Sequence, residues 1–196
     1  MNYLAHLFLA GTDPQAQLGG LLGDFAKPRD DHLFPDLVRR EIRLHRAIDA
    51  YTDAHPLVLG SKALFRPGAR RFSGMVLDVL YDHFLAAGWS RHSDEDLDAF
   101  IARFYAHLDA TPLPLPGRLA RVAPLLIAQD WLGSYRSLAG VERAVDGMSH
   151  RVSRGGEQMR AGLDDVHQHY DALRERYEDF FPELARFVAT ERLRRP

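Results

Sequence analysis

The sequence predicts an all-α protein, folded as one compact bundle of about nine or ten helices. Apolar residues recur with helical spacing along the whole chain of 196 residues. No segment alternates polar and apolar residues for long enough to form a β-strand. Proline and glycine interrupt the pattern at intervals of an ordinary helix length. We therefore expect a single helical domain over residues 1–196.

The boundaries of the expected helices follow from these interruptions. Asp13-Pro14 is typical of an N-cap followed by proline at the first helical position, and His55-Pro56 marks a similar start. Between the breaks, we expect helices over Pro35–Asp53 and Arg71–Trp89 and a C-terminal helix near Asp164–Phe180. The full set of expected breaks is Gly11–Pro14, Pro28–Pro35, His55–Pro56, Pro67–Gly68, Thr111–Gly117, Gly140 and Gly155–Gly156.

Composition narrows the classes of function. A formal net charge of −2 gives no overall attraction to nucleic acid or to a membrane. The chain has no cysteine, which excludes disulfides and thiolate metal ligands. The apolar start MNYLAHLFLAGTDPQ is too short to span a bilayer and lacks the basic region of a signal peptide. We therefore expect a cytoplasmic protein.

The predicted helix Arg71–Trp89 carries ionisable residues where apolar ones are expected. Its apolar residues lie on every side, which is typical of a fully buried helix. It nevertheless contains Asp78, Asp82 and His83. Burying unpaired charges costs several kcal/mol per ion, so another group must compensate them. A bound metal cation is the simplest candidate.

A second helix, Pro35–Asp53, shows the same anomaly. His45 and Asp49 lie one turn apart within the apolar stripe that contains Val38 and Ile42. Alone, His45 would suggest an ordinary core histidine, and Asp49 an arginine-paired carboxylate. Side chains at this spacing can reach one ion, however, and two such helices favour a shared site.

Two further residues fit the same site. His6 is the only ionisable side chain in MNYLAHLFLA, and Asp24 lies in the glycine-rich stretch GGLLGDFAKP. The structural alternatives are a histidine bonded to a backbone carbonyl and an aspartate that caps a turn. Imidazole and carboxylate ligands suit Mn²⁺, Mg²⁺, Fe²⁺ or Zn²⁺.

Several segments together resemble one known family. They are NYLAHLFLA, LLGDFAKP, LHRAIDAYTD, VLDVLYDHFLAAGW, QDWLGSYR, GMSHR and HYDALRERYEDFFP. In order and spacing they resemble the acyl carrier protein phosphodiesterases. That family is described as an outlying relative of the HD phosphohydrolases. The resemblance implies an HD-phosphohydrolase-like helical fold and dependence on a divalent metal, most often Mn²⁺. It also implies hydrolysis of holo-acyl carrier protein to the apo form and 4′-phosphopantetheine.

The resemblance also indicates site residues. The HD pattern has a His-Asp doublet, whereas this chain has Asp82-His83, so ligands cannot be transferred from HD enzymes in general. Within the narrower family, the recurring polar positions correspond to His6, Asp24, His45, Asp49, Asp53, Asp78, Asp82 and His83. As a hypothesis, the metal ligands are Asp24, His45, Asp82 and His83. The hypothetical catalytic residues, which would orient an imidazole, accept a proton from water or protonate the leaving serine oxygen, are His6, Asp49 and Asp78.

An acyl carrier protein is small and acidic, so its docking surface should be locally basic. The candidates are arginines of the loop Phe65–Arg71 and of the outer face of the helix Pro35–Asp53. They are Arg66, Arg70 and Arg71 in the loop, and Arg39, Arg40 and Arg43 on the helix. A solvated arginine face without a partner is the alternative.

Two other functions remain open at this point. The same chemistry could act on a nucleotide or another small phosphoester. Alternatively, the protein could be a non-catalytic helical module that binds a partner. In that case Arg46 and Arg136 would be available to pair with the buried carboxylates in a purely structural network.

Overall fold

The structure is a computed structural model that describes residues 1–194. Within these residues it contains α-helices and two short 3₁₀-helices but no β-strand, which confirms the predicted all-α fold. Its α-helices are α1 (Tyr3–Ala10), α2 (Pro14–Leu22), α3 (Asp36–Ala54), α4 (Pro56–Ala63), α5 (Pro67–Arg70), α6 (Ser73–Ala87), α7 (Leu97–Asp109), α8 (Gly117–Ala128), α9 (Trp131–Ser134), α10 (Leu138–Ser149) and α11 (Gly156–Arg194). The 3₁₀-helices are η1 (Pro28–Leu33) and η2 (Trp89–Arg91).

Two of the predicted helix starts have the expected geometry. The Asp13 carboxylate accepts hydrogen bonds from the backbone N–H groups of Gln15 (2.8 Å) and Ala16 (3.0 Å), with Pro14 at the first position of α2. At the start of α4, the His55 side chain accepts a bond from the Leu57 N–H (3.3 Å). Both contacts satisfy N–H groups that a helix leaves unpaired at its first turn.

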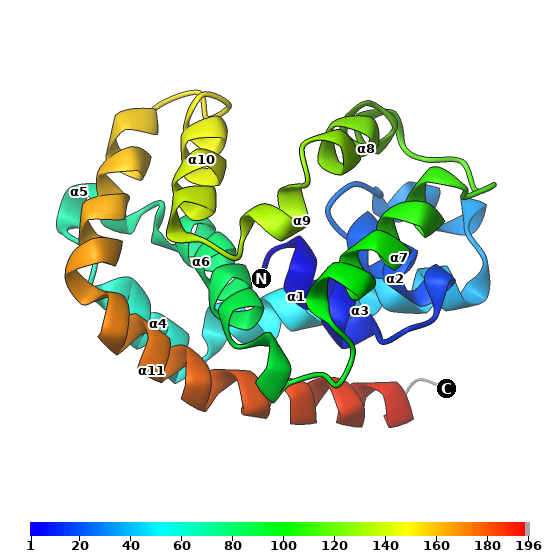
Figure 1. Cartoon of the computed structure of the whole chain (residues 1–196), viewed down its shortest axis with the longest axis horizontal. Helices are drawn as coiled ribbons and strands as arrows, with labels where there is room; N and C mark the ends of the chain where they lie inside the picture. The colour runs from blue at the N-terminus through cyan, green and yellow to red at the C-terminus, as the bar shows by residue number, and fades with distance from the viewer. Residues whose placement is uncertain (195–196) are drawn as a thin grey trace.

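Helices α1, α2, α3 and α6 pack together around the middle of the molecule, close to the N-terminus (Figure 1). The contact between α2 and α3 is close because α2 contains glycine. A methyl group at Gly19 would lie 2.7 Å from the Val38 carbonyl oxygen, so a larger residue would push the helices apart. On α6, residues from both sides are buried, as its all-round apolar sequence predicts. The exceptions include Met75 and Ala87, which are exposed, and Asp78, whose side chain is 40% exposed.

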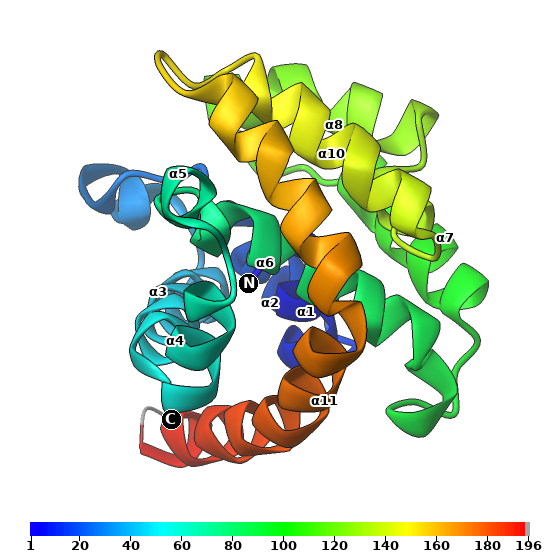
Figure 2. The ribbon, with the colours of Figure 1, turned by 90° about the vertical axis from the view of Figure 1, so that its left-hand side faces the viewer.

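The C-terminal helix is longer than predicted. α11 covers Gly156–Arg194, with a bend at His169 (φ −116°, ψ 17°), and runs along one edge of the molecule (Figures 1 and 2). It packs against α3, α4, α5, α6 and α10. The apolar stripe continues beyond the predicted end through Leu184 and Val188, both buried, so the helix remains attached to the core past Pro182.

Gly140 does not interrupt a helix, contrary to the sequence-based expectation. It lies inside α10, whose start is capped by Ser137. A methyl group at Gly140 would lie 1.8 Å from the Ser134 carbonyl oxygen. Glycine is therefore needed here for close packing between α9 and α10, and the chain breaks before Ser137 instead.

No helix among the described residues has both the length and the apolar character required to cross a bilayer.

Candidate metal centre

Three of the predicted site residues converge inside the bundle. His6 comes from α1, and His45 and Asp49 come from α3; their ligand atoms all lie within 4.8 Å of one another. Asp49 contacts both histidines, with 3.1 Å from Oδ1 to His6 Nε2 and 3.1 Å from Oδ2 to His45 Nε2. The two imidazole rings stack with centroids 3.6 Å apart. We refer to His6, His45 and Asp49 as the His–Asp centre.

Asp24 lies beside this centre, just after α2. Its Oδ1 atom is 3.5 Å from His45 Nε2. The preceding glycine makes this approach possible, because a Cβ atom at Gly23 would lie 2.1 Å from Cγ of His45. The glycine-rich stretch around Asp24 therefore brings the backbone against a site residue.

The orientation of His45 is determined by its second ring nitrogen. His45 Nδ1 donates a hydrogen bond to the Gly20 carbonyl oxygen at 2.7 Å. Nε2 is thereby directed at the carboxylates of Asp24 and Asp49. Histidines that bind metals usually have this arrangement, with one nitrogen on the metal and the other donating to a carbonyl or carboxylate.

Asp78 joins the centre indirectly, through the amino group of Met1. This buried nitrogen lies 2.8 Å from Asp78 Oδ1 and 3.3 Å from Asp49 Oδ1. Burial alone would lower the pKa of the amino group, but the two carboxylates outweigh burial and raise its pKa to about 10. A positive charge is therefore already held between Asp49 and Asp78.

The electrostatics of the centre favour cations. Burial opposes charging of His45, yet its hydrogen bonds to Asp24 and Asp49 raise its pKa to about 9. Burial and the adjacent His45 lower the pKa of His6 to about 4, so this ring is neutral at pH 7. Although burial opposes its ionisation, Asp49 has a pKa held well below its usual range by both histidines. At pH 7 the metal-free centre thus combines a neutral His6, a protonated His45 and an ionised Asp49.

The structure gives Asp82 a different task from the predicted one. Its buried carboxylate accepts hydrogen bonds from the backbone N–H groups of Leu4 (2.7 Å) and Ala5 (3.0 Å). Burial raises the pKa of Asp82 to about 7, against the effect of these two donors. Asp82 therefore caps the first turn of α1, the helix that carries His6, and both its oxygens are used for this.

His83 also lies outside the His–Asp centre. Its Nδ1 atom donates to the Tyr135 carbonyl oxygen at 2.8 Å, and its Nε2 atom accepts from the Tyr170 hydroxyl at 2.8 Å. Neighbouring helical residues point about 100° apart, so Asp82 and His83 face different parts of the molecule. Neither side chain belongs to the His–Asp centre, and their role as metal ligands stays a prediction.

Two of the predicted docking arginines are occupied by carboxylates. Arg66 bonds to Asp165 (2.9 Å) and Asp164 (3.0 Å) on α11, and Arg39 bonds to Asp36 one turn earlier on α3. These contacts neutralise much of the charge that a partner would meet. Their assignment to a docking surface therefore loses its support.

Other predicted docking arginines keep their charge available. Arg70 donates to the carbonyl oxygens of Phe65 (3.1 Å) and Ala63 (3.0 Å), and Arg71 lies 4.5 Å over the Phe72 ring. Arg43 is exposed on α3 and has no carboxylate partner in the described part of the chain.

Neither arginine proposed for a purely structural network reaches the His–Asp centre. Arg46 donates to the Ala26 carbonyl oxygen (3.1 Å) and pairs with Asp31 (3.4 Å). Arg136 pairs with Asp98 instead. The charges of the centre are therefore balanced without these arginines.

Together, the fold and the site define an all-helical protein with an internal group of two histidines and an aspartate that could hold a metal ion. A family model described as acyl carrier protein phosphodiesterase matches residues 1–184. The chain belongs to the acyl carrier protein phosphodiesterase family.

Individual relatives match over almost the whole chain. The acyl carrier protein phosphodiesterase of Salmonella dublin is 37% identical over 196 residues, covering 98% of this chain and 100% of the relative. The protein of the same name from Enterobacter sp. (strain 638) is 37% identical over 187 residues, covering 94% and 95%. No solved structure matches the chain, so the HD-like character of the fold stays a prediction.

Proposed function

We propose that this protein hydrolyses the phosphodiester between the serine of holo-acyl carrier protein and its prosthetic arm, releasing 4′-phosphopantetheine. Membership of the family supports the substrate. The observation that carries the chemistry is the His–Asp centre, with ligand atoms of His6, His45 and Asp49 within 4.8 Å of one another. The proposal includes dependence on a divalent metal, with Mn²⁺ as the expected ion.

The residues of the centre fit such an ion. Two imidazole nitrogens and carboxylate oxygens are donors that Mn²⁺, Fe²⁺ and Zn²⁺ accept. His6 Nε2 and His45 Nε2 each lie 3.1 Å from an oxygen of Asp49, so all three groups can reach one ion. His6, His45 and Asp49 would hold the ion, with Asp24 beside them. When bound, the ion would polarise a phosphoryl oxygen and lower the pKa of a water molecule.

The protonation states of His6 and Asp24 indicate their roles beside the ion. Because burial lowers the pKa of His6 to about 4, its ring is neutral at pH 7, which favours a ligand over a proton donor. Asp24 has a pKa lowered by its bond to His45 despite burial, and its side chain is 41% exposed. We assign to Asp24 the acceptance of a proton from the attacking water. Gly20 and Asp82 have structural roles. The Gly20 carbonyl orients His45, and Asp82 holds the first turn of α1.

Mass spectrometry of intact holo-acyl carrier protein tests this function. We expect the protein with Mn²⁺ to convert the carrier to its apo form, with 4′-phosphopantetheine in solution and no conversion when a chelator is present. Nucleotide phosphomonoesters in parallel reactions test the alternative substrate class. Conversion of nucleotides with the carrier left intact would contradict the proposal.

The apparent affinity for Mn²⁺ should increase with pH. In the metal-free centre His45 holds its proton up to a pKa of about 9, and an ion at Nε2 must displace that proton. Affinity should therefore rise about tenfold per pH unit through the neutral range and level off above pH 9. His6 has a pKa of about 4, so it adds no further pH dependence to the affinity in the neutral range. Calorimetric titrations in buffers of different ionisation enthalpy would measure the released proton, and a pH-independent affinity below pH 9 would contradict the assignment.

Docking of an acidic carrier should depend on the available arginines. We expect the charge reversals Arg43→Glu and Arg71→Glu, combined, to lower kcat/KM for holo-carrier protein by about tenfold and to weaken its salt dependence. The matched control reverses two exposed arginines that likewise have no carboxylate partner among the described residues, Arg121→Glu on α8 and Arg186→Glu on α11. Steady-state kinetics at several salt concentrations would decide. Equal losses in both double variants would argue against docking at Arg43 and Arg71.

A further inference from the structure

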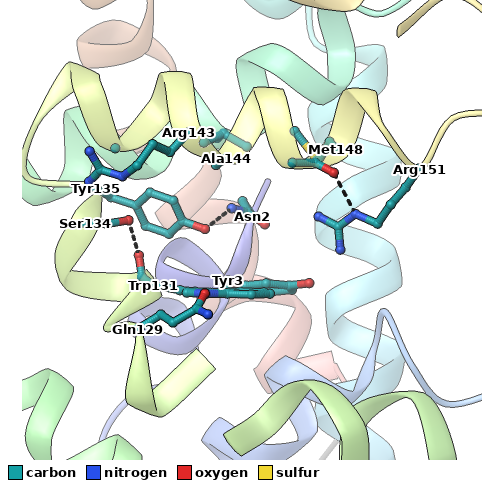
Figure 3. A pocket seen from close by; sticks show the side chains of 13 residues that line it. Asn2, Tyr3, Gln129, Trp131, Ser134, Tyr135, Arg143, Ala144, Met148 and Arg151 are labelled. Atoms are coloured by element: carbon teal, nitrogen blue, oxygen red, sulfur yellow. Dashed lines mark hydrogen bonds between the residues drawn. The ribbon is translucent and has the colours of Figure 1, made fainter. Parts of the chain in front are cut away.

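A cavity of about 410 Å³ opens between the start of the chain, α9 and α10 (Figure 3). Tyr3 and Trp131 lie on one side of it, and Ala144 and Met148 of α10 lie on the other (Figure 3). This volume and this mixture of aromatic and aliphatic walls are typical of a site for a small organic ligand.

The cavity and the His–Asp centre share the first residues of the chain. The amino group of Met1 contacts Asp49, whereas the next two residues, Asn2 and Tyr3, line the cavity. On α6, Asp78 contacts the same amino group and its neighbour Val79 lines the cavity. The cavity and the centre are therefore connected through adjacent residues at the start of the chain and on α6.

Polar groups are placed along the apolar walls. The side chains of Asn2, Gln129 and Ser134 line the cavity, and Asn2 is held there by a hydrogen bond to the Tyr135 hydroxyl (2.8 Å). Such groups can pair with the amides and hydroxyl of a flexible polar chain, while the aromatic rings pack against its methyl and methylene groups.

Two arginines give the cavity a positive charge. Arg143 and Arg151 line it, and neither has a carboxylate partner within residues 1–194. Arg151 donates only to the Gly147 carbonyl oxygen (3.0 Å) through its side chain. This charge is complementary to the acidic surface of the carrier protein.

Two segments that carry no residue of the centre supply much of the lining. QDWLGSYR provides Gln129, Trp131, Ser134 and Tyr135, and GMSHR provides Gly147, Met148 and Arg151. Neither segment contains a predicted metal ligand or catalytic residue. A binding role in the cavity accounts for them.

We propose that this cavity binds the 4′-phosphopantetheine arm of the carrier protein, with Tyr3 and Trp131 against its chain and Arg143 and Arg151 facing the acidic carrier, while the phosphate lies at the His–Asp centre. The proposal rests on the proposed function and specifies how that function selects its substrate. Binding energy from a remote part of the substrate can be used to position the reacting bond.

Gly147→Trp tests the cavity with little risk to the fold. A Cβ atom at Gly147 would meet only Arg151 Nη2, at 4.0 Å, so the indole can enter open space. We expect kcat/KM for holo-carrier protein to fall by about 100-fold more than that for bis(4-nitrophenyl) phosphate, which has no arm. Leu125→Trp on α8 adds the same ring at an exposed position outside the cavity and is the matched control. Equal activity of Gly147→Trp and wild type on the holo-carrier would overturn the proposal and leave the proposed function standing.

Calorimetry with free 4′-phosphopantetheine separates the cavity from catalysis. The wild-type protein and Leu125→Trp should bind it, and Gly147→Trp should not. This result holds even if no variant releases the arm from the carrier, an outcome that would count against the proposed function alone. Absence of binding to the wild-type protein would overturn the cavity proposal.

Discussion

Replacement of Asp49 by asparagine is expected to remove most of the metal binding and turnover while the helical fold remains. Asp49 is the only carboxylate of the His–Asp centre, and its two oxygens face His6 and His45 at 3.1 Å each. Asparagine keeps the shape and loses the charge. We expect the affinity for Mn²⁺ to fall by at least about 100-fold. Turnover of holo-carrier protein should fall by about 1000-fold, since a catalytic ion contributes several kcal/mol to the transition state.

The same variant has a readout that does not depend on activity. In metal-free Asp49→Asn, the protonated form of His45 should be less stable than in the wild-type protein. The pKa of His45 should therefore fall below its wild-type value of about 9. A nuclear magnetic resonance titration of the imidazole would measure this shift. Asp53→Asn is the control, because Asp53 lies one turn further along α3, is 71% exposed and bonds to Lys62 instead. If Asp49→Asn behaved like this control, Asp49 could not belong to the site.

Gly23→Ala is expected to disable the centre by adding one methyl group. The backbone of Gly23 is in the right-handed helical region (φ −51°, ψ −36°), where alanine is readily accommodated. The obstacle is steric, because the new Cβ atom would lie 2.1 Å from Cγ of His45. Displacement of the ring by about 1 Å should lower kcat by about 100-fold. The affinity for Mn²⁺ should fall by about 10- to 100-fold.

The matched control is Gly68→Ala, since a Cβ atom there has no other atom within 4 Å. Both variants should be folded by circular dichroism, with a loss of about 1–3 kcal/mol in the unfolding free energy of Gly23→Ala as the cost of overpacking. If Gly23→Ala bound Mn²⁺ with wild-type affinity, metal binding would not depend on the observed position of the His45 ring.

The helical spacing of apolar residues predicted the features that are determined within one helix. The helix observed at Asp36–Ala54 was expected at Pro35–Asp53, and the pair His45 and Asp49 shares one face of it as the helical repeat requires. The glycine-rich stretch that contains Asp24 packs against His45 through Gly23. These features follow from spacing within one element or from the size of one residue.

Contacts between distant parts of the chain could not be predicted in this way. The partners of Asp82 are 77 and 78 residues away, and α1 has no side-chain cap of its own from Asn2 that would mark the need for one. Burial of a carboxylate suggested an ion, although backbone N–H groups satisfy it equally well. Arg66 likewise meets its carboxylates on α11, almost 100 residues further along.

Anomalous diffraction from crystals grown with Mn²⁺ would test the central claim most directly. The account predicts a manganese peak bonded to Nε2 of His6, Nε2 of His45 and a carboxylate oxygen of Asp49. A peak held by Asp82 and His83, or bound manganese only at sites away from α1 and α3, would contradict it.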